Sequence, residues 1–240
     1  MSQIPKKVYV SWKTKDIFES SSPIIQNGIR NLESLNPEWS VEFYVDEEID
    51  DSLKQLLGHS DYSLLQNAHI VEKLDVWRLL KIYYDGGVYL DVDRLYNIPL
   101  DNLITDQTQW VLPIHNHYDF SHDMMMSSPR NPAFELALSL YFQRRIAGHD
   151  SVYFLGPQTY MHAVTQTLFG AMINTNPGKE TFQEMQNKIE ETSFIETYNE
   201  TSLFDTIVFQ KPDDFIEFDH ETEKRKLYAD FDMKHWTGEW

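Results

Sequence analysis

The sequence predicts an α/β fold in which a mostly parallel, twisted sheet is flanked by helices. Strand patterns and helix patterns alternate along the first half of the chain, as a parallel sheet with helical crossovers requires. The length of 240 residues suits one domain, and 41% hydrophobic residues supply enough apolar side chain for a sizeable core. We therefore expect a single α/β domain.

The first elements follow from alternation, capping and proline positions. Residues 7–12 alternate as a strand. Ser22 and Pro23 then resemble an N-cap and a first helical residue, and apolar residues at helical spacing continue to Asn36. A second strand is expected at residues 41–45, so the chain opens as a strand, helix, strand unit.

The most informative helix lies in the middle of the first half. An acidic segment at 46–51 leads into short helices near 53–57 and 62–68, and an amphipathic helix follows at 71–84. Gly86 and Gly87 end this helix. The later expected elements are strands at 88–90, 109–112, 124–127, 205–209 and 226–229, helices at 132–147 and 157–169, and a polar stretch at 174–200.

Composition narrows the classes of partner. The formal charge of -18 argues against a nucleic-acid backbone or an anionic lipid surface as a general partner, because both would be repelled. The chain has no cysteine, which excludes disulfides and cysteine-ligated zinc, and it has no apolar run long enough for a membrane span. The first residues carry no signal-peptide pattern, so we expect a cytoplasmic protein.

Two carboxylates at a strand end predict a metal-diphosphate site. Asp91 and Asp93 follow the expected strand 88–90, and ligands of open α/β sheets bind at the carboxyl ends of strands. Carboxylates at this spacing suit Mg²⁺ or Mn²⁺ together with substrate phosphates. On the preceding helix Asp75 and Arg78 share one face, although three-residue spacing is also typical of an ordinary intrahelical ion pair.

The combined pattern resembles a known family. The residues that carry the resemblance are Asp75, Arg78, Gly86, Gly87, Tyr89, Asp91 and Asp93. Together they resemble glycosyltransferase family 32, a family of DXD-motif sugar transferases related to the clostridial glucosylating toxins. The resemblance implies a single GT-A type domain over residues 1–240. Residues 1–113 would form its nucleotide-sugar-binding half, and residues 114–240 its acceptor-binding half with a C-terminal lid.

The resemblance also implies roles for the motif residues. Asp75 and Arg78 would contact the nucleoside and sugar of the donor, and Tyr89 would lie against its ribose. Asp91 and Asp93 would hold Mn²⁺ or Mg²⁺, with Asp93 the direct ligand and Asp91 acting partly through water or the ribose.

Residues outside the motif extend the resemblance. Trp12 ends an opening segment similar to that of the family and would pack on the base. By the same resemblance His235 would be a third metal ligand, and Trp240 would close over the diphosphate. Gly156 stands in a Leu-Gly-Pro loop similar to the family's Thr-Gly-Pro loop and would border the donor, and Asp123 is the candidate catalytic carboxylate beside the sugar.

The implied activity is a metal-dependent, retaining transfer of a sugar from a nucleotide diphosphate sugar to a glycan hydroxyl. A UDP-sugar is favoured as donor, GDP-mannose remains open, and surface polysaccharide synthesis is the expected setting.

Two alternatives remain open on the residues alone. His115, His117, Asp119 and His122 lie close together in the sequence, as the ligands of a metal-dependent hydrolase can. A binding protein that holds a nucleotide sugar without turnover is the other alternative.

Overall fold

A computed structural model of the chain describes residues 3–15, 23–92, 99–115, 119–120, 122–169, 207–210, 225–226 and 228–229. The strands are β1 (Lys7–Trp12), β2 (Ser40–Val45), β3 (Gly87–Asp91), β4 (Trp110–His115), β5 (Asp119–Phe120), β6 (Met124–Ser127) and β7 (Ile207–Gln210). The helices are α1 (Pro23–Leu35), α2 (Asp46–Leu56), α3 (His59–Leu65), α4 (Ile70–Asp85), α5 (Pro132–Ile146), α6 (Val152–Leu155) and α7 (Pro157–Phe169), with a 3-10 helix η2 (Leu100–Leu103).

The described strands form one mixed sheet. Its order is β2-β1-β3-β6-β4-β5, and β7 pairs with β4. β1 is parallel to both β2 and β3, whereas β6 is antiparallel to β3 and β4. The α/β class is confirmed. The first half of the sheet is all parallel, and in the second half β7 is parallel to β4. The second half is mixed because β4, β5 and β6 follow one another closely, and neighbouring strands joined by short connections pair antiparallel.

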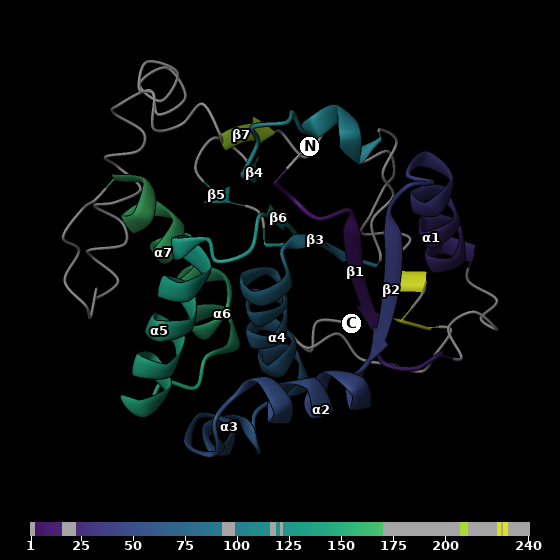
Figure 1. Cartoon of the computed structure of the whole chain (residues 1–240). Helices are drawn as coiled ribbons and strands as arrows, with labels where there is room; N and C mark the ends of the chain where they lie inside the picture. Colours follow the sequence, from purple (N-terminus) through teal and green to yellow (C-terminus); the bar gives the residue numbers. More distant parts are fainter. Residues whose placement is uncertain are drawn as a thin grey trace.

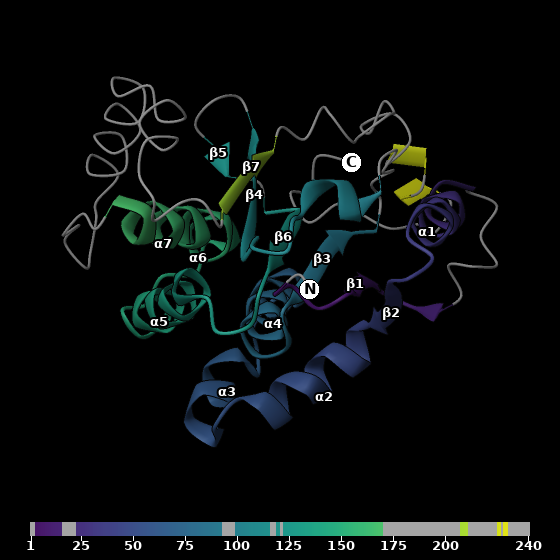
Figure 2. The ribbon, with the colours of Figure 1, turned by 45° about the horizontal axis from the view of Figure 1, so that its top comes forward.

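Helices cover both faces of the sheet (Figures 1 and 2). Helices α2 to α7 lie on one face, and α1 with η2 lies on the other. The strands alternate accordingly, since side chains point to opposite faces at a period of two. Tyr9 and Tyr89 join the core beneath α4, whereas Val10 and Leu90 join the core beneath α1.

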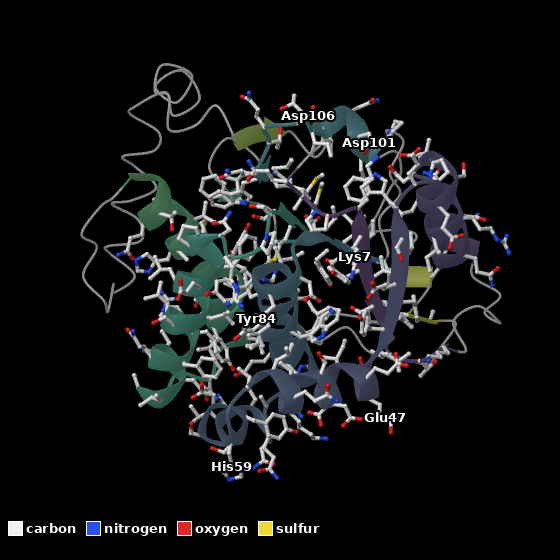
Figure 3. The ribbon with its side chains drawn as sticks, in the orientation of Figure 1. Lys7, Glu47, His59, Tyr84, Asp101 and Asp106 are labelled. Atoms are coloured by element: carbon white, nitrogen blue, oxygen red, sulfur yellow. The ribbon has the colours of Figure 1, made fainter. Side chains whose placement is uncertain are left out.

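The α1 layer is fixed by polar contacts of η2. Asp101, labelled in Figure 3, accepts from Trp39 Nε1 at 3.0 Å and from Lys6 Nζ at 2.8 Å. The amide oxygen of Asn36, the residue after α1, accepts from Leu100 N at 2.7 Å. These contacts join the end of α1 to the connection between β3 and β4.

The structure corrects two element predictions. α2 begins at Asp46 rather than near residue 53, because acidic residues favour a helix N-terminus and Glu48 accepts from Val45 N at 3.1 Å. Residues 225–226 and 228–229 have helical backbone, so the strand expected at 226–229 is wrong. β5 and α6 were not expected, since both are too short to show a period. No helix in the described residues is long and apolar enough to span a membrane.

Candidate functional site

The candidate site lies where the strand order reverses. The chain runs from β1 outward to β2 and then returns to place β3 on the other side of β1. Such a switch point leaves a crevice at the carboxyl ends of the two central strands, and ligands of open α/β sheets bind there. Ser11 is paired with Asp91 in the register, so Trp12 and Asp91 end the two strands at this edge.

A glycine turn returns the chain from α4 to this edge. Gly86 has φ +65° and Gly87 has φ +96°, and a Cβ at Gly87 would lie 2.7 Å from Lys7 O. Both positions therefore require glycine. From the turn, α4 reaches back about 10–15 Å to Arg78 and Asp75, while β3 advances about 13 Å to Asp91. The helix and strand thus deliver their charged side chains to the same place.

Arg78 gathers the charged groups of the site. It is 5% exposed, and its Nη2 donates to Asp75 Oδ1. Its Nη1 donates to the carbonyl oxygen of His122 at 2.9 Å and lies 3.5 Å from Asp91 Oδ1. The guanidinium also lies over the ring of Tyr89, 5.1 Å from its centre. The predicted Asp75–Arg78 pair is therefore buried and reaches beyond its own helix, unlike an exposed surface ion pair.

Tyr89 connects the strand to its terminal carboxylate. Its hydroxyl donates to Asp91 Oδ1 at 2.8 Å. Burial, with the carboxylate of Asp91 beside it, raises the pKa of Tyr89 well above its usual value, so the hydroxyl keeps its proton. The Asp91 side chain is 30% exposed, which leaves it accessible from the edge of the sheet.

The residues before β6 close one side of the site. Asp91 N donates to Asp123 O at 2.8 Å, so Asp123 stands directly beside the end of β3. The side chain of His122 lies beside the buried pair, with Nε2 3.5 Å from Asp75 Oδ1. Burial and the nearby Arg78 guanidinium lower the pKa of His122 well below its usual value. The imidazole is therefore neutral at physiological pH.

Gly156, between α6 and α7, packs against the carboxylate of Asp75. A Cβ at this position would lie 1.9 Å from Asp75 Oδ2 and 2.7 Å from its Cγ. Asp75 Oδ2 is buried and has no hydrogen-bond partner among the described residues. The predicted glycine is thus brought to the site, and its close approach to Asp75 explains why no side chain fits there.

The structure describes most of the sequence-predicted site residues, and three of them lie outside the described ranges. Six of the predicted residues contact one another in one group: Asp75, Arg78, Tyr89, Asp91, Asp123 and Gly156. Trp12 lies at the same edge of the sheet. Asp93, His235 and Trp240 lie outside the described residues, so their predicted roles stay predictions.

One residue of the histidine-rich stretch 115–122 lies at the buried Asp75–Arg78 pair, and this residue is His122. His115 pairs with Asp119 in the register of β4 and β5, and His117 lies outside the described residues. His122 is turned toward Asp75. Its proximity to Asp75 and Arg78 was not expected, because contacts across more than 40 residues leave no periodic signal in the sequence.

A separate pocket of about 410 Å³ opens between α2 and α4. It is lined by Tyr44, Glu48, Asp51, Ser52, Gln55, Leu56, Lys81, Tyr84 and Asp85. Figure 3 labels Tyr84, which lines this pocket, and Glu47 in the first turn of α2. None of the sequence-predicted site residues lines this pocket, and the converging buried charges at the end of β3 indicate the functional site more strongly than a surface hollow does.

Comparison with known proteins points to the same segment. Residues 22–110 match the model of a family described as "Glycosyltransferase sugar-binding region containing DXD motif". This range includes Asp75, Arg78 and Asp91.

Two curated relatives are yeast enzymes. Inositol phosphoceramide mannosyltransferase 1 of Schizosaccharomyces pombe is 26% identical over 132 residues, which cover 55% of this chain and 41% of that protein. Mannosyl phosphorylinositol ceramide synthase SUR1 of Saccharomyces cerevisiae is 26% identical over 170 residues, which cover 71% of this chain and 41% of that protein. The chain therefore spans about two fifths of the length of these relatives.

A solved structure shares the fold. The structure titled PaToxG Glycosyltransferase matches with a TM-score of 0.54 at 17% sequence identity, covering 95% of this chain and 86% of that chain. At this identity the likeness describes the arrangement of the sheet and helices.

Proposed function

We propose that the protein transfers a sugar from a nucleotide diphosphate sugar to an acceptor hydroxyl, because residues 22–110 match a glycosyltransferase sugar-binding region containing a DXD motif. The observation that carries the proposal is the buried Asp75–Arg78 pair held against Asp91 at the switch point of the sheet. Buried charges that converge at such an edge indicate a ligand site rather than a stabilising surface pair.

The charge balance of the described site fits a divalent cation. Among the described residues, two carboxylates share one guanidinium: Asp75 and Asp91 both lie at Arg78, while His122 is neutral. Asp123 adds a third acidic residue, whose backbone is bonded to Asp91. The excess negative charge disfavours a bare diphosphate and favours one that arrives with Mn²⁺ or Mg²⁺, both of which prefer oxygen ligands. In the proposal Asp91, Asp93 and His235 would hold the ion.

The chain's own residues have separate tasks in the proposed reaction. Arg78 positions Asp75 toward the donor and limits the repulsion between Asp75 and Asp91. Tyr89 orients Asp91 by its hydrogen bond, and Asp123 borders the reacting sugar. A bound Mn²⁺ or Mg²⁺ stabilises the negative charge of the leaving diphosphate. Retention of configuration is a further part of the proposal, taken from the family resemblance.

The donor and acceptor are proposed by chemical class. One yeast relative is named a mannosyltransferase and the other a mannosyl phosphorylinositol ceramide synthase. Both names support GDP-mannose as a donor to test beside the UDP-sugars expected from the family. The first name includes inositol phosphoceramide and the second phosphorylinositol ceramide, which adds an inositol phosphate lipid to glycans as an acceptor class to test. Polysaccharide synthesis and a cytoplasmic location stay predictions.

A donor turnover assay tests the proposal. The protein is incubated with Mn²⁺ and, separately, UDP-glucose, UDP-N-acetylglucosamine and GDP-mannose, and the released nucleotide is measured. We expect release from one donor and its loss in Asp93→Ala, with His117→Ala retaining activity. Release that survives Asp93→Ala but disappears in His117→Ala would instead support the histidine-based hydrolase. Binding of a donor without any release would support a non-catalytic binding protein.

A further inference from the structure

An aromatic residue from the far end of the chain lies at the candidate site. The rings of Trp12 and Tyr228 contact each other with centroids 6.0 Å apart and an interplanar angle of 74°. The two residues are separated by more than 200 positions, and both are half-buried. The ammonium of Lys13 lies over the Tyr228 ring, 5.6 Å from its centre. The contact therefore joins the end of β1 to a segment that follows the described sheet.

This contact is placed at the switch point rather than elsewhere on the surface. Trp12 stands one residue beyond Ser11, the register partner of Asp91. From strand spacing, the Cα atoms of Trp12 and Asp91 are about 6 Å apart. The side chain of Asp91 lies on the α4 face beside Tyr89 and Arg78, whereas Trp12 packs against the core of the α1 face. A ligand bound through its phosphates near Asp91 would therefore reach the Trp12 and Tyr228 rings by crossing the carboxyl edge of the sheet.

The ring geometry suits a flat ligand. Rings that meet nearly at right angles form a corner, in which the ring presenting its edge keeps both faces clear of the other. A planar heterocycle can stack on one ring and lie with its edge against the second. Such aromatic contacts stabilise a bound ring beyond the area that they bury.

From these contacts we propose that Tyr228 is a binding residue for the nucleobase of the donor and forms one wall of a corner with Trp12. The inference rests on the proposed function, since it needs a nucleotide at the switch point. It adds to that function a contact from outside the matched region 22–110. It also separates the recognition of the base, by Trp12 and Tyr228, from that of the phosphates near Asp91.

Calorimetric titration of the full chain tests the inference without any need for turnover. UDP, GDP and inorganic pyrophosphate are each titrated in the presence of Mn²⁺ into wild type and Tyr228→Ala. We expect Tyr228→Ala to weaken the affinity for the nucleotide that wild type binds by about two- to tenfold, as loss of one aromatic contact predicts. Pyrophosphate has no base, so its affinity is expected to be unchanged.

Matched variants distinguish a contact with the base from a general effect on folding. Tyr228→Phe keeps the ring and is expected to bind as wild type, and Tyr228→Leu keeps apolar bulk without a ring and is expected to bind as Tyr228→Ala. Tyr153→Ala removes an exposed tyrosine of α6 and is expected to change neither affinity.

The outcomes separate the inference from the proposed function. If wild type binds a nucleotide and neither Tyr228→Ala nor Tyr228→Leu weakens it, Tyr228 is not a binding residue and the inference fails alone. It also fails if these variants weaken pyrophosphate as much as the nucleotide. If wild type binds neither UDP nor GDP, the proposed function fails and the inference fails with it.

Discussion

At the scale of single residues, Arg78 controls the charge balance of the site. Removing one partner of a buried ion pair leaves an uncompensated charge and costs about 3–5 kcal/mol. Arg78 contacts Asp75, Asp91 and the carbonyl oxygen of His122 at once. It therefore both stabilises the two carboxylates and fixes their positions. Among the described residues this cluster is still acidic overall, which favours the binding of a cation.

Tyr89→Phe tests the hydrogen bond that orients Asp91. The variant keeps the ring beneath the Arg78 guanidinium and removes only the hydroxyl that donates to Asp91 Oδ1. We expect a loss of about 1 kcal/mol in the free energy of unfolding, which is the net worth of an ordinary hydrogen bond. Donor kcat/KM should fall with it. Unfolding in urea and donor kinetics measure the two effects, and unchanged kinetics would mean that Asp91 needs no such orientation.

Gly156→Ala tests the contact between the α6–α7 turn and Asp75. The added Cβ would lie within 1.9 Å of Asp75 Oδ2, so the turn or the carboxylate must move. Overpacking of this kind costs about 1–3 kcal/mol. We expect the free energy of unfolding to fall by that amount and nucleotide affinity to fall about tenfold. Gly58→Ala is the control for affinity, because a Cβ at Gly58 meets nothing within 4 Å. Equal affinity in both variants would contradict a role for Gly156 in placing Asp75.

At the scale of elements, the turn that carries Gly156 is held by a buried arginine of α5. Arg144 is 4% exposed and donates to Phe154 O at 3.0 Å and to Thr159 Oγ1 at 2.6 Å. Its Nη2 lies 3.0 Å from His162 Nδ1 on α7. Burial, with the Arg144 guanidinium nearby, lowers the pKa of His162 to about 4, and burial lowers that of Arg144 to about 10. The packing of Arg144 against the turn between α6 and α7 therefore depends on a neutral His162.

This arrangement predicts a loss of stability in acid. Between pH 6.5 and about 4 the unfolded chain protonates His162 and the folded chain does not, so the free energy of unfolding falls as pH falls through this window. The full effect of a shift of this size is about 3 kcal/mol. In His162→Gln this contribution is absent, and urea unfolding at pH 7 and pH 4.5 should show a smaller difference than in wild type. His59→Gln, at the exposed start of α3 in Figure 3, is the control. If His162→Gln lost as much free energy of unfolding between pH 7 and pH 4.5 as wild type does, His162 would not be the source of the acid sensitivity.

At the scale of the whole molecule, two core layers and one sheet bring distant segments to a common edge. Alternation predicted the strands that build both layers, as at Tyr9 and Val10, because burial on two faces leaves a period of two in the sequence. The Gly86–Gly87 turn was also predictable, since its backbone excludes other residues. Local patterns thus indicated both the motif and the strands around it.

Contacts between distant segments could not be predicted in this way. The approach of Gly156 to Asp75, the position of His122 beside the Asp75–Arg78 pair, and the contact of Tyr228 with Trp12 all depend on how helices and segments pack across the sheet. A single sequence carries no periodic signal for such pairs. The family resemblance assigned roles to several of these residues, and the structure adds the residues that hold them in place.

The most direct test of the account is the metal-dependent binding of a nucleotide diphosphate, followed as thermal and chemical stability. We predict that UDP or GDP with Mn²⁺ stabilises wild type, by about 2.7 kcal/mol at 100 times the dissociation constant. Asp91→Asn, which removes one charge at the end of β3, should lose most of this stabilisation. Stabilisation of equal size without the metal ion, or in Asp91→Asn, would contradict the account.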